Sequence, residues 1–327
     1  MKFSGRRAEA ASIVVAVVNR LLTLFILSLL AFALARLAPG DPAALILRSS
    51  GEEPSPAAIE ALQVQLGLNR SWPEQYLIWG WRLVCCLDLG ISFNGGGRVA
   101  AEFLARLPAT LTLTAAAAII TIVLSLGGGL LSAWQRRSWL DWAAWLTAML
   151  GASLPGYWLG LLLAYFFGVY LGWLPVSGYG QWQQLVLPAL SLALIVSATQ
   201  IQLFRARLLT ALAEPHILTA QAKGLSRRQV LLCHALPRAI GPNIQALGLS
   251  IGQMLAGSAI IETIFAWPGV GRLAVESVLR RDYPMIQAYV LLIGFIFILI
   301  TFLTDLAHAW CDPLARLSLR GEIDYET

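Results

Sequence analysis

Few residues of this 327-residue chain have the types and spacing that chemistry requires. A phosphate-binding loop needs the pattern Gly-x-x-x-x-Gly-Lys followed by Ser or Thr. The only lysines are Lys2, which Phe3 follows, and Lys223, which Gly224 follows. The chain therefore has no nucleotide-binding loop of this type. If ATP drives its function, another polypeptide must hydrolyse that ATP.

Histidine and cysteine are equally sparse. The histidines are His216, His234 and His308, and no Gly-x-Ser-x-Gly or His-Glu-x-x-His sequence accompanies them. The four cysteines show no Cys-x-x-Cys spacing, and the adjacent Cys85 and Cys86 stand in an apolar stretch, where packing explains them. We therefore expect no catalytic residue, no metal site and no cofactor in this chain.

Two carboxylates stand in strongly apolar segments. Ionisable residues inside membrane spans mark either a function or a satisfied internal pair. Asp305 lies near the inner end of its segment, where a solvated or helix-paired carboxylate is the simpler interpretation. Glu262 ends a segment whose glutamines and glycines favour contact with water. We predict that Gln253 and Glu262 line a passage through the membrane, with burial between neighbouring helices as the alternative.

The longest polar interruption in the second half of the chain covers residues 216–242 (HILTAQAKGLSRRQVLLCHALPRAIGP). Six basic side chains lie in it or just before it, against the one carboxylate of Glu214. Such an excess of Lys and Arg is typical of cytoplasmic loops. The six are Arg205, Arg207, Lys223, Arg227, Arg228 and Arg238.

We predict that this polar stretch folds as a helix, a glycine and a second helix. Residues 218–222 end the first helix, with Gly224 just past it as a left-handed cap. Ser226 and Gln229 form a capping box that begins the second helix, and Pro237 marks its end or a kink. The apolar side of the second helix is expected to consist of Val230, Leu231, Cys233 and Leu236. A turn that is basic outside and apolar inside suits docking against a soluble partner.

The composition identifies the class of protein. Apolar residues make up 58% of the chain, charged residues 13%, and the mean hydropathy is +0.70, which indicates an integral membrane protein. The net charge is +5, but no basic runs interleaved with aromatic residues occur, which argues against nucleic-acid binding. Arg6 and Arg7 precede a long apolar run with no obvious cleavage site, so we expect an uncleaved first span.

A membrane-spanning helix needs about 20 mostly apolar residues, and six segments qualify. Residues 155–156 (PG) predict a kink in the third, and the glycines at 127–129 indicate close helix packing in the second. The six are residues 21–38, with a start as early as Ile13, then 109–134, 142–168, 185–204, 246–264 and 285–310.

We expect one membrane domain over residues 1–327, with an outer segment at 39–106 and a cytoplasmic loop at 205–245. The outer segment opens with a turn and holds a short amphipathic helix over 56–66 that Gly67 stops. With both termini inside, the inner side holds 14 of the 23 Lys and Arg residues, as the positive-inside rule expects. Two inner termini also agree with an even number of spans.

The polar stretch resembles the EAA loop of ABC importer permeases. That loop reads Glu-Ala-Ala, three residues, Gly, nine residues, then Ile-x-Leu-Pro. Residues 218–220 (LTA) stand at the first three positions, Gly224 at the glycine and residues 234–237 (HALP) at the end. Leu218 replaces the acid and His234 replaces the isoleucine.

The peptide/nickel branch of that family commonly reads RTARAKGL at this place, and residues 219–225 (TAQAKGL) are similar to it. Leu218 replaces the branch's first arginine, so an ion pair from that arginine to an ATPase is not carried over. The sequence of residues 170–175 (YLGWLP) with 178–182 (GYGQW) looks most like the nickel-type permease. Other family-typical segments are 36–42 (RLAPGDP), 66–68 (LGL), 75–76 (QY), 88–93 (DLGISF), 107–111 (LPATL), 262–272 (ETIFAWPGVGR) and 281–284 (RDYP).

The resemblance implies an all-α integral membrane fold with six transmembrane helices, the type I ABC importer domain, in the bacterial inner membrane with both termini cytoplasmic. A second homologous permease chain would complete the path, surrounded by membrane lipid. Two ABC ATPase subunits carrying ATP-Mg would hold the EAA loops, and a periplasmic solute-binding protein would deliver solute. The implied coupling residues are Thr219, Ala220, Ala222, Lys223, Gly224, Leu225, Ser226, Leu236 and Pro237.

The nickel-type similarity predicts import of nickel as a small chelate. Dipeptide, oligopeptide, glutathione and metallophore import are the alternatives within the family. A passive channel or secondary transporter is the alternative from another class, but it needs no docking loop and more often carries charges at mid-span. A membrane scaffold that transports nothing is the third hypothesis.

Overall fold

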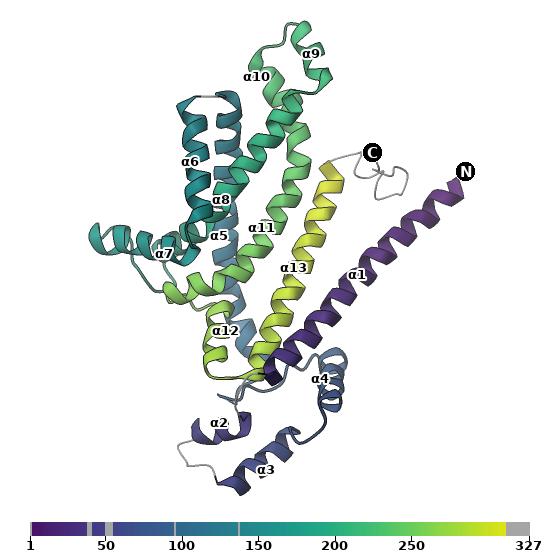
Figure 1. The fold of residues 1–327 in the computed structure, drawn as a ribbon, viewed down its shortest axis with the longest axis vertical. Helices are drawn as coiled ribbons and strands as arrows, with labels where there is room; N and C mark the ends of the chain where they lie inside the picture. Colours follow the sequence, from purple (N-terminus) through teal and green to yellow (C-terminus); the bar gives the residue numbers. More distant parts are fainter. Residues whose placement is uncertain (1, 38–40, 50–54, 95, 137, 312–327) are drawn as a thin grey trace. The chain divides into compact units, whose positions relative to one another are not determined.

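A computed structural model describes residues 2–37, 41–49, 55–94, 96–136 and 138–311 of the chain. Figure 1 shows that this part is almost entirely helical. Its extended pairing is limited to one isolated bridge between Ile91 and Arg98. The α-helices are α1 (Lys2–Leu37), α2 (Pro42–Ser49), α3 (Pro56–Leu66), α4 (Trp72–Cys86), α5 (Val99–Trp134), α6 (Trp139–Ser153), α7 (Gly156–Leu163), α8 (Trp182–Leu212), α9 (Pro215–Ala222), α10 (Arg227–Gln229), α11 (Leu236–Ile264), α12 (Val270–Leu279) and α13 (Tyr283–Cys311), with π-helical stretches η1 (Ala164–Tyr170) and η2 (Val230–Ala235).

The all-helical membrane class predicted from the sequence is confirmed. Four helices in the described part of the chain are long and apolar enough to cross a membrane, and the two other predicted spans correspond to shorter apolar helices. The four long ones are Val99–Trp134, Trp182–Leu212, Arg227–Ile264 and Tyr283–His308. The shorter ones are Val17–Ala33 and Gly156–Tyr170.

Two compact units divide the described chain. The larger is built around Leu111–Trp267, and the smaller is built around Asn19–Thr110 and Pro268–Phe295. Helix α8 is the centre of the larger unit, where it packs against α6, α7 and α11. The expectation of a single domain over the whole chain stays a prediction.

Gly128 and Gly129 set the close approach of α5 to α8, as the sequence predicted, whereas a Cβ atom on Gly127 would meet nothing within 4 Å. A Cβ atom on Gly129 would lie 2.7 Å from a ring carbon of Phe204 and 3.3 Å from the backbone nitrogen of Arg205. A Cβ atom on Gly128 would lie 3.2 Å from the side chain of Ile201. Because real Cβ atoms do not approach so closely to fixed neighbours, a larger residue at 129 would force the two helices apart.

The third predicted span is broken rather than kinked. Helix α6 ends at Ser153, and α7 begins at Gly156 after Pro155, which adopts an extended conformation. Figure 1 draws α7 crosswise to α6. Proline lacks the N–H that a continuing helix would donate, and it disfavours a helical residue before it, so the break follows from the sequence.

A buried carboxylate organises the smaller unit. Asp282, which is 3% exposed, accepts hydrogen bonds from the Ser92 hydroxyl at 2.5 Å and from the backbone N–H of Phe93 at 3.2 Å. The side-chain amide of Asn94 donates to the Arg280 carbonyl at 3.3 Å. These contacts join two family-typical segments, 88–93 and 281–284, that are distant in sequence. We call Ser92, Phe93, Asn94 and Asp282 the carboxylate hub.

Apolar packing completes the smaller unit beside the carboxylate hub. The backbone N–H of Val270 donates to the Thr110 hydroxyl at 2.9 Å, which fixes the start of α12 against α5. The predicted helix over 56–66 is confirmed as α3, and Gly67 ends it with φ +69°. The buried apolar residues are Val99, Phe103, Val270, Leu273, Met285 and Ala288.

Candidate functional site

The polar stretch predicted to be a helix–glycine–helix turn folds in that way. Helix α9 ends at Ala222, and Gly224 follows in the left-handed conformation with φ +80°. The N–H of Gly224 donates to the Gln221 carbonyl at 2.9 Å, and the N–H of Leu225 donates to the Ala220 carbonyl at 3.3 Å. This pair of bonds is a Schellman motif, which satisfies the last carbonyls of a helix. We call residues 215–237 the elbow.

The second half of the elbow begins with the predicted capping box. The N–H of Gln229 donates to the Ser226 hydroxyl oxygen at 3.4 Å, and the N–H of Ser226 donates to the Gln229 side-chain carbonyl at 2.9 Å. Helix α10 then continues through η2 into α11 without a break. Pro237 therefore does not end the helix. Pro237 instead lies in the first turn of α11, shortly after the π-helical stretch η2, which ends at Ala235.

Apolar side chains hold the two halves of the elbow together. Ile217 and Ala220 of α9 form a buried cluster with Val230, and Leu225 packs on it from the turn. The contact of the residue after the glycine with the preceding helix commonly accompanies a Schellman motif. The prediction that Cys233 belongs to the apolar side is wrong, because its side chain is exposed.

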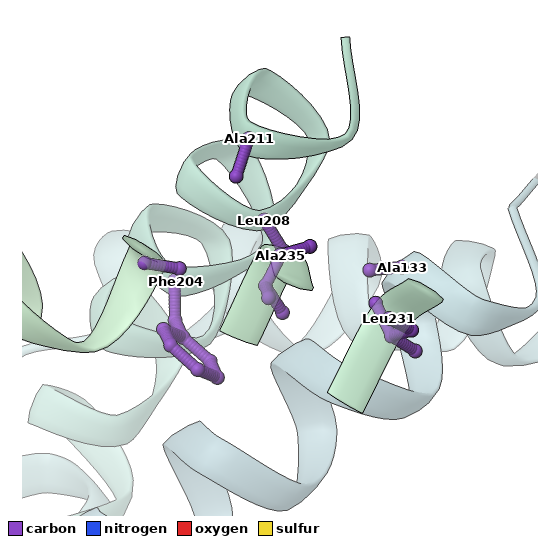
Figure 2. Packing of buried hydrophobic residues seen from close by; sticks show 7 residues of the cluster. Ala133, Phe204, Leu208, Ala211, Leu231 and Ala235 are labelled. Atoms are coloured by element: carbon purple, nitrogen blue, oxygen red, sulfur yellow. The ribbon is translucent and has the colours of Figure 1, made fainter. Parts of the chain in front are cut away.

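A second cluster fixes the elbow to the long helices. Figure 2 shows side chains from three separate segments in one cluster. They are Ala133 of α5, then Phe204, Leu208 and Ala211 of α8, and Leu231 with Ala235 of η2. Phe204 and Leu208 in this cluster are fully buried. A displacement of the elbow must therefore move α5, α8 or α11, or else open this packing. The buried members of this cluster, which we call the anchor cluster, are Ala133, Phe204, Leu208, Ala211, Leu231, Ala235 and Ala239.

The outer surface of the elbow is polar and basic. Among the nine predicted coupling residues, Ala220 is buried, and Leu225 and Leu236 are half-buried. The exposed ones are Thr219, Ala222, Lys223, Gly224, Ser226 and Pro237. Arg227 and Arg228 are exposed beside them, so the turn presents three cations to its surroundings. Leu218, at the position where the family carries an acid, is 68% exposed.

One carboxylate lies at the base of the elbow. Glu214 Oε2 is 3.1 Å from His216 Nδ1 and 3.6 Å from Arg238 Nη1. The rings of His216 and His234 lie 6.4 Å apart, one from each half of the elbow. Glu214 therefore offsets part of the basic charge at the base of the elbow. The exposed cations of the turn, Lys223, Arg227 and Arg228, lie away from this carboxylate in the sequence.

The two basic residues just before the polar stretch belong to a long helix. Arg205 and Arg207 lie within α8, and Arg205 pairs with Asp141 of α6 at 2.5 Å and 2.8 Å through two nitrogens. Asp141 also accepts a hydrogen bond from Ser132 of α5. Such a two-pronged Arg–carboxylate contact is directional and strong. The sequence analysis missed Asp141, and the only local signal was an acid in the first turn of an apolar helix.

The sequence of the chain matches a known family of membrane proteins over most of its length. Residues 125–317 match the family described as "Binding-protein-dependent transport system inner membrane component", and residues 11–114 match that family's N-terminal component. The chain is 39% identical over 307 residues to the "Glutathione transport system permease protein GsiC" of Escherichia coli O6:H1, covering 92% of this chain and 98% of that protein. It is 38% identical, with the same coverage, to the proteins of that name from Escherichia coli K12 and Shigella dysenteriae.

The chain belongs to this family: it is an ABC importer permease of the peptide/nickel type. A solved amino acid ABC transporter shares 21% identity with a TM-score of 0.47, covering 68% of this chain and 94% of that chain, a likeness too slight to bear on the fold. Membership of this family rules out the hypotheses of a passive channel, a secondary transporter and a membrane scaffold that transports nothing. It also makes the permease a transport component of a binding-protein-dependent system.

The permease's two predicted path residues lie in different surroundings on α11. Gln253 is exposed, on the same helical stripe as Gln245, Leu249 and Gly257. Glu262 is fully buried and accepts a hydrogen bond from Ser258 at 3.1 Å, so within this chain it lies away from that stripe. Gly248 and Gly252, read from the sequence as signs of water contact, instead make room for Thr304 and Phe297 of α13. The path assignment of Gln253 stays a prediction.

The described part of the permease holds no group of three or more His, Cys, Asp or Glu side chains close enough to bind a metal ion. Some family-typical residues lie outside the described residues, among them positions 38–40 of the segment 36–42. The elbow and the helices that carry it are therefore the site that the structure defines best.

Proposed function

We propose that the elbow is the surface on which an ATPase subunit docks. The observation that supports this is its construction: a turn capped on both sides, with exposed cations outside and the anchor cluster inside. Because the elbow runs directly into α11 and packs on α5 and α8, closure of ATPases around ATP-Mg would move these helices with it. Lys223, Arg227 and Arg228 would face the ATPase surface.

The complete importer in this proposal holds two permease chains and two ATPase subunits. The second permease is a homologue of this one and completes the path along the exposed stripe of α11. A periplasmic solute-binding protein delivers solute from outside. Both termini of this chain are cytoplasmic, which the excess of basic residues on the inner side supports. ATP-Mg is bound by the partner subunits alone.

The substrate in this proposal is a small peptide, with glutathione as the reference compound. Its support is the 38–39% identity over 92% of the chain to permeases named for glutathione transport. Affinity for the peptide resides mostly in the binding protein. The permease supplies the path.

Nickel, carried as a small chelate, is the second candidate substrate. The residues that favour it are 170–175 (YLGWLP) and 178–182 (GYGQW), which resemble the nickel-type permease. The two substrates differ in charge and size, so a transport measurement separates them.

The test compares uptake of labelled glutathione, a labelled dipeptide and labelled nickel in cells that lack the chromosomal copy of this chain. We expect the wild-type chain to restore peptide uptake and the Gly224→Val variant to leave it at background. If the chain restores nickel uptake and leaves both peptides unchanged, the peptide proposal is wrong and nickel takes its place. Uptake of any of them by Gly224→Val at the wild-type rate would contradict the docking role of the elbow.

A further inference from the structure

Helix α4 carries an apolar surface that the described residues of the smaller unit leave exposed. The helix has 15 residues, and its exposed apolar side chains Leu77, Trp81 and Val84 are 68%, 70% and 77% exposed. Their spacing of four and three residues places all three on one stripe of the helix. Exposed apolar groups in such a row mark a contact with another surface or with lipid.

Contacts between α4 and α1 set the depth of this helix. The hydroxyl groups of Tyr76 and Ser28 are 2.8 Å apart, and the ring of Tyr76 packs edge-on against Phe32 at 5.4 Å and Phe25 at 6.5 Å. Trp79 lies 6.1 Å from Phe32. Figure 1 draws α4 beside the C-terminal end of α1.

These α1 residues belong to its apolar stretch, Val17–Ala33. At 1.5 Å per residue, Phe25 lies about 12 Å below the end of that stretch. In a membrane protein this stretch occupies the hydrocarbon region, and a helix packed on its upper part lies at the same depth. Helix α4 is about 22 Å long, shorter than the roughly 30 Å of the hydrocarbon core, so it does not span.

The charged residues of α4 lie on an exposed side of the helix, which borders a cavity. Glu74 and Arg82, the charged residues of this helix, are eight residues apart and share a stripe with Ile78. Ile78 and Arg82 line a cavity of about 720 Å³ together with Arg36, Asp88 and Asn94. The helix therefore has a charged side beside the cavity, a side packed on α1, and an exposed apolar side.

We propose that α4 lies in the outer leaflet of the membrane, with Leu77, Trp81 and Val84 in contact with lipid. Tryptophan and leucine on one side and charges on the other are typical of helices at the membrane interface, where Trp is enriched. Lipid is the occupant, because the stripe lies beside the apolar stretch of α1 and at its depth. The outer segment is thereby attached to the membrane by a second apolar contact besides the span itself.

The test places single labels on the full chain in lipid nanodiscs. Cys85, Cys86, Cys233 and Cys311 are first replaced by serine. Leu77→Cys, Trp81→Cys and Val84→Cys are then compared with Arg82→Cys on the charged side of α4. Val64→Cys, an exposed apolar position on α3, is the matched control. Each carries a fluorescent label that is quenched by brominated acyl chains in the lipid or by iodide in the water.

We expect severalfold stronger quenching by brominated lipid than by iodide at 77, 81 and 84, and the reverse at 82 and 64. Iodide quenching at 77 and 84 that matches position 64 would overturn the proposal. If 77 and 84 are quenched by iodide alone and become shielded only when the solute-binding protein is added, the stripe is a protein-docking surface and the lipid proposal is also overturned. None of these outcomes depends on the substrate or on the ATPase contact.

Discussion

The elbow and the outer segment contain the same local turn in different surroundings. In both, a helix ends in a Schellman motif at a left-handed glycine, and a serine soon begins the next helix. The outer turn pairs the N–H of Gly67 with Val64 at 3.1 Å and that of Leu68 with Gln63 at 2.8 Å. The N–H groups of Gly224 and Leu225 make the matching bonds in the elbow.

The two turns differ in the contacts and charges around them. The elbow presents three exposed cations and rests on the anchor cluster, whereas the outer segment is joined to the rest of its unit by the carboxylate hub and by aromatic contacts of α4 with α1. Local sequence thus specifies the turn, and the packing and charge around it decide what the turn does. This difference can be tested by substitutions that remove the anchor cluster's packing and leave the carboxylate hub intact, or the reverse.

The largest effect is expected from Phe204→Ala, which opens a cavity in the anchor cluster. Loss of a fully buried Phe side chain costs about 3–5 kcal/mol. We expect thermal denaturation of the purified chain to shift strongly, together with weaker attachment of ATPase subunits. The matched control is Phe295→Ala, whose ring is 54% exposed and whose loss should cost little. Equal destabilisation by the two variants would mean that the cluster does not support the elbow.

The next effect is expected from Asp282→Ala in the carboxylate hub. It removes the acceptor for the Ser92 hydroxyl and the Phe93 N–H, and loss of such charged hydrogen bonds costs roughly 2–4 kcal/mol. Limited proteolysis should then cut the segment 88–97 faster, while ATPase attachment at the elbow stays unchanged. Loss of ATPase attachment without faster proteolysis would contradict the separation of the two regions.

A smaller effect is expected from removal of the serine cap in the elbow. Ser226→Ala loses the acceptor for the Gln229 N–H, which costs about 1 kcal/mol. We predict a small decrease in denaturation temperature and reduced but measurable transport. Ser226→Thr keeps the hydroxyl and should restore transport. A Ser226→Ala variant that transports nothing would show that this serine makes a direct contact with a partner.

The elbow could be predicted from sequence because its bonds are local. Gly224, Ser226 and Gln229 stand within six residues of one another, and capping rules apply at that range. The exposure of Cys233 and the pairing of Arg205 with Asp141 could not be predicted, because they depend on which helices pack together. The choice for Glu262 between a place along the passage and burial between helices also depends on helix packing, and within this chain the residue is buried.

The outer segment was harder to predict. Helix α4 has 15 residues, so it falls below the length of a span, and the aromatic contacts that hold it lie on α1. Ser92 and Asp282 are 190 residues apart, so only the fold brings them together. The short helix over 56–66 was predicted because its stop signal, Gly67, directly follows it.

The two glycine turns give the most direct test of the claim that the elbow couples this permease to its ATPases. Gly224 and Gly67 both adopt a positive φ, and a valine at either is strained by about 1–2 kcal/mol, without any neighbour within 3.4 Å of the new Cβ. The measurement is the amount of ATPase that co-purifies with Gly224→Val and with Gly67→Val, each at normal levels in the membrane. We predict that Gly224→Val loses the ATPase subunits and transport, while Gly67→Val keeps the ATPase subunits. Equal retention of ATPase by both variants, or disappearance of Gly224→Val from the membrane, would contradict the account.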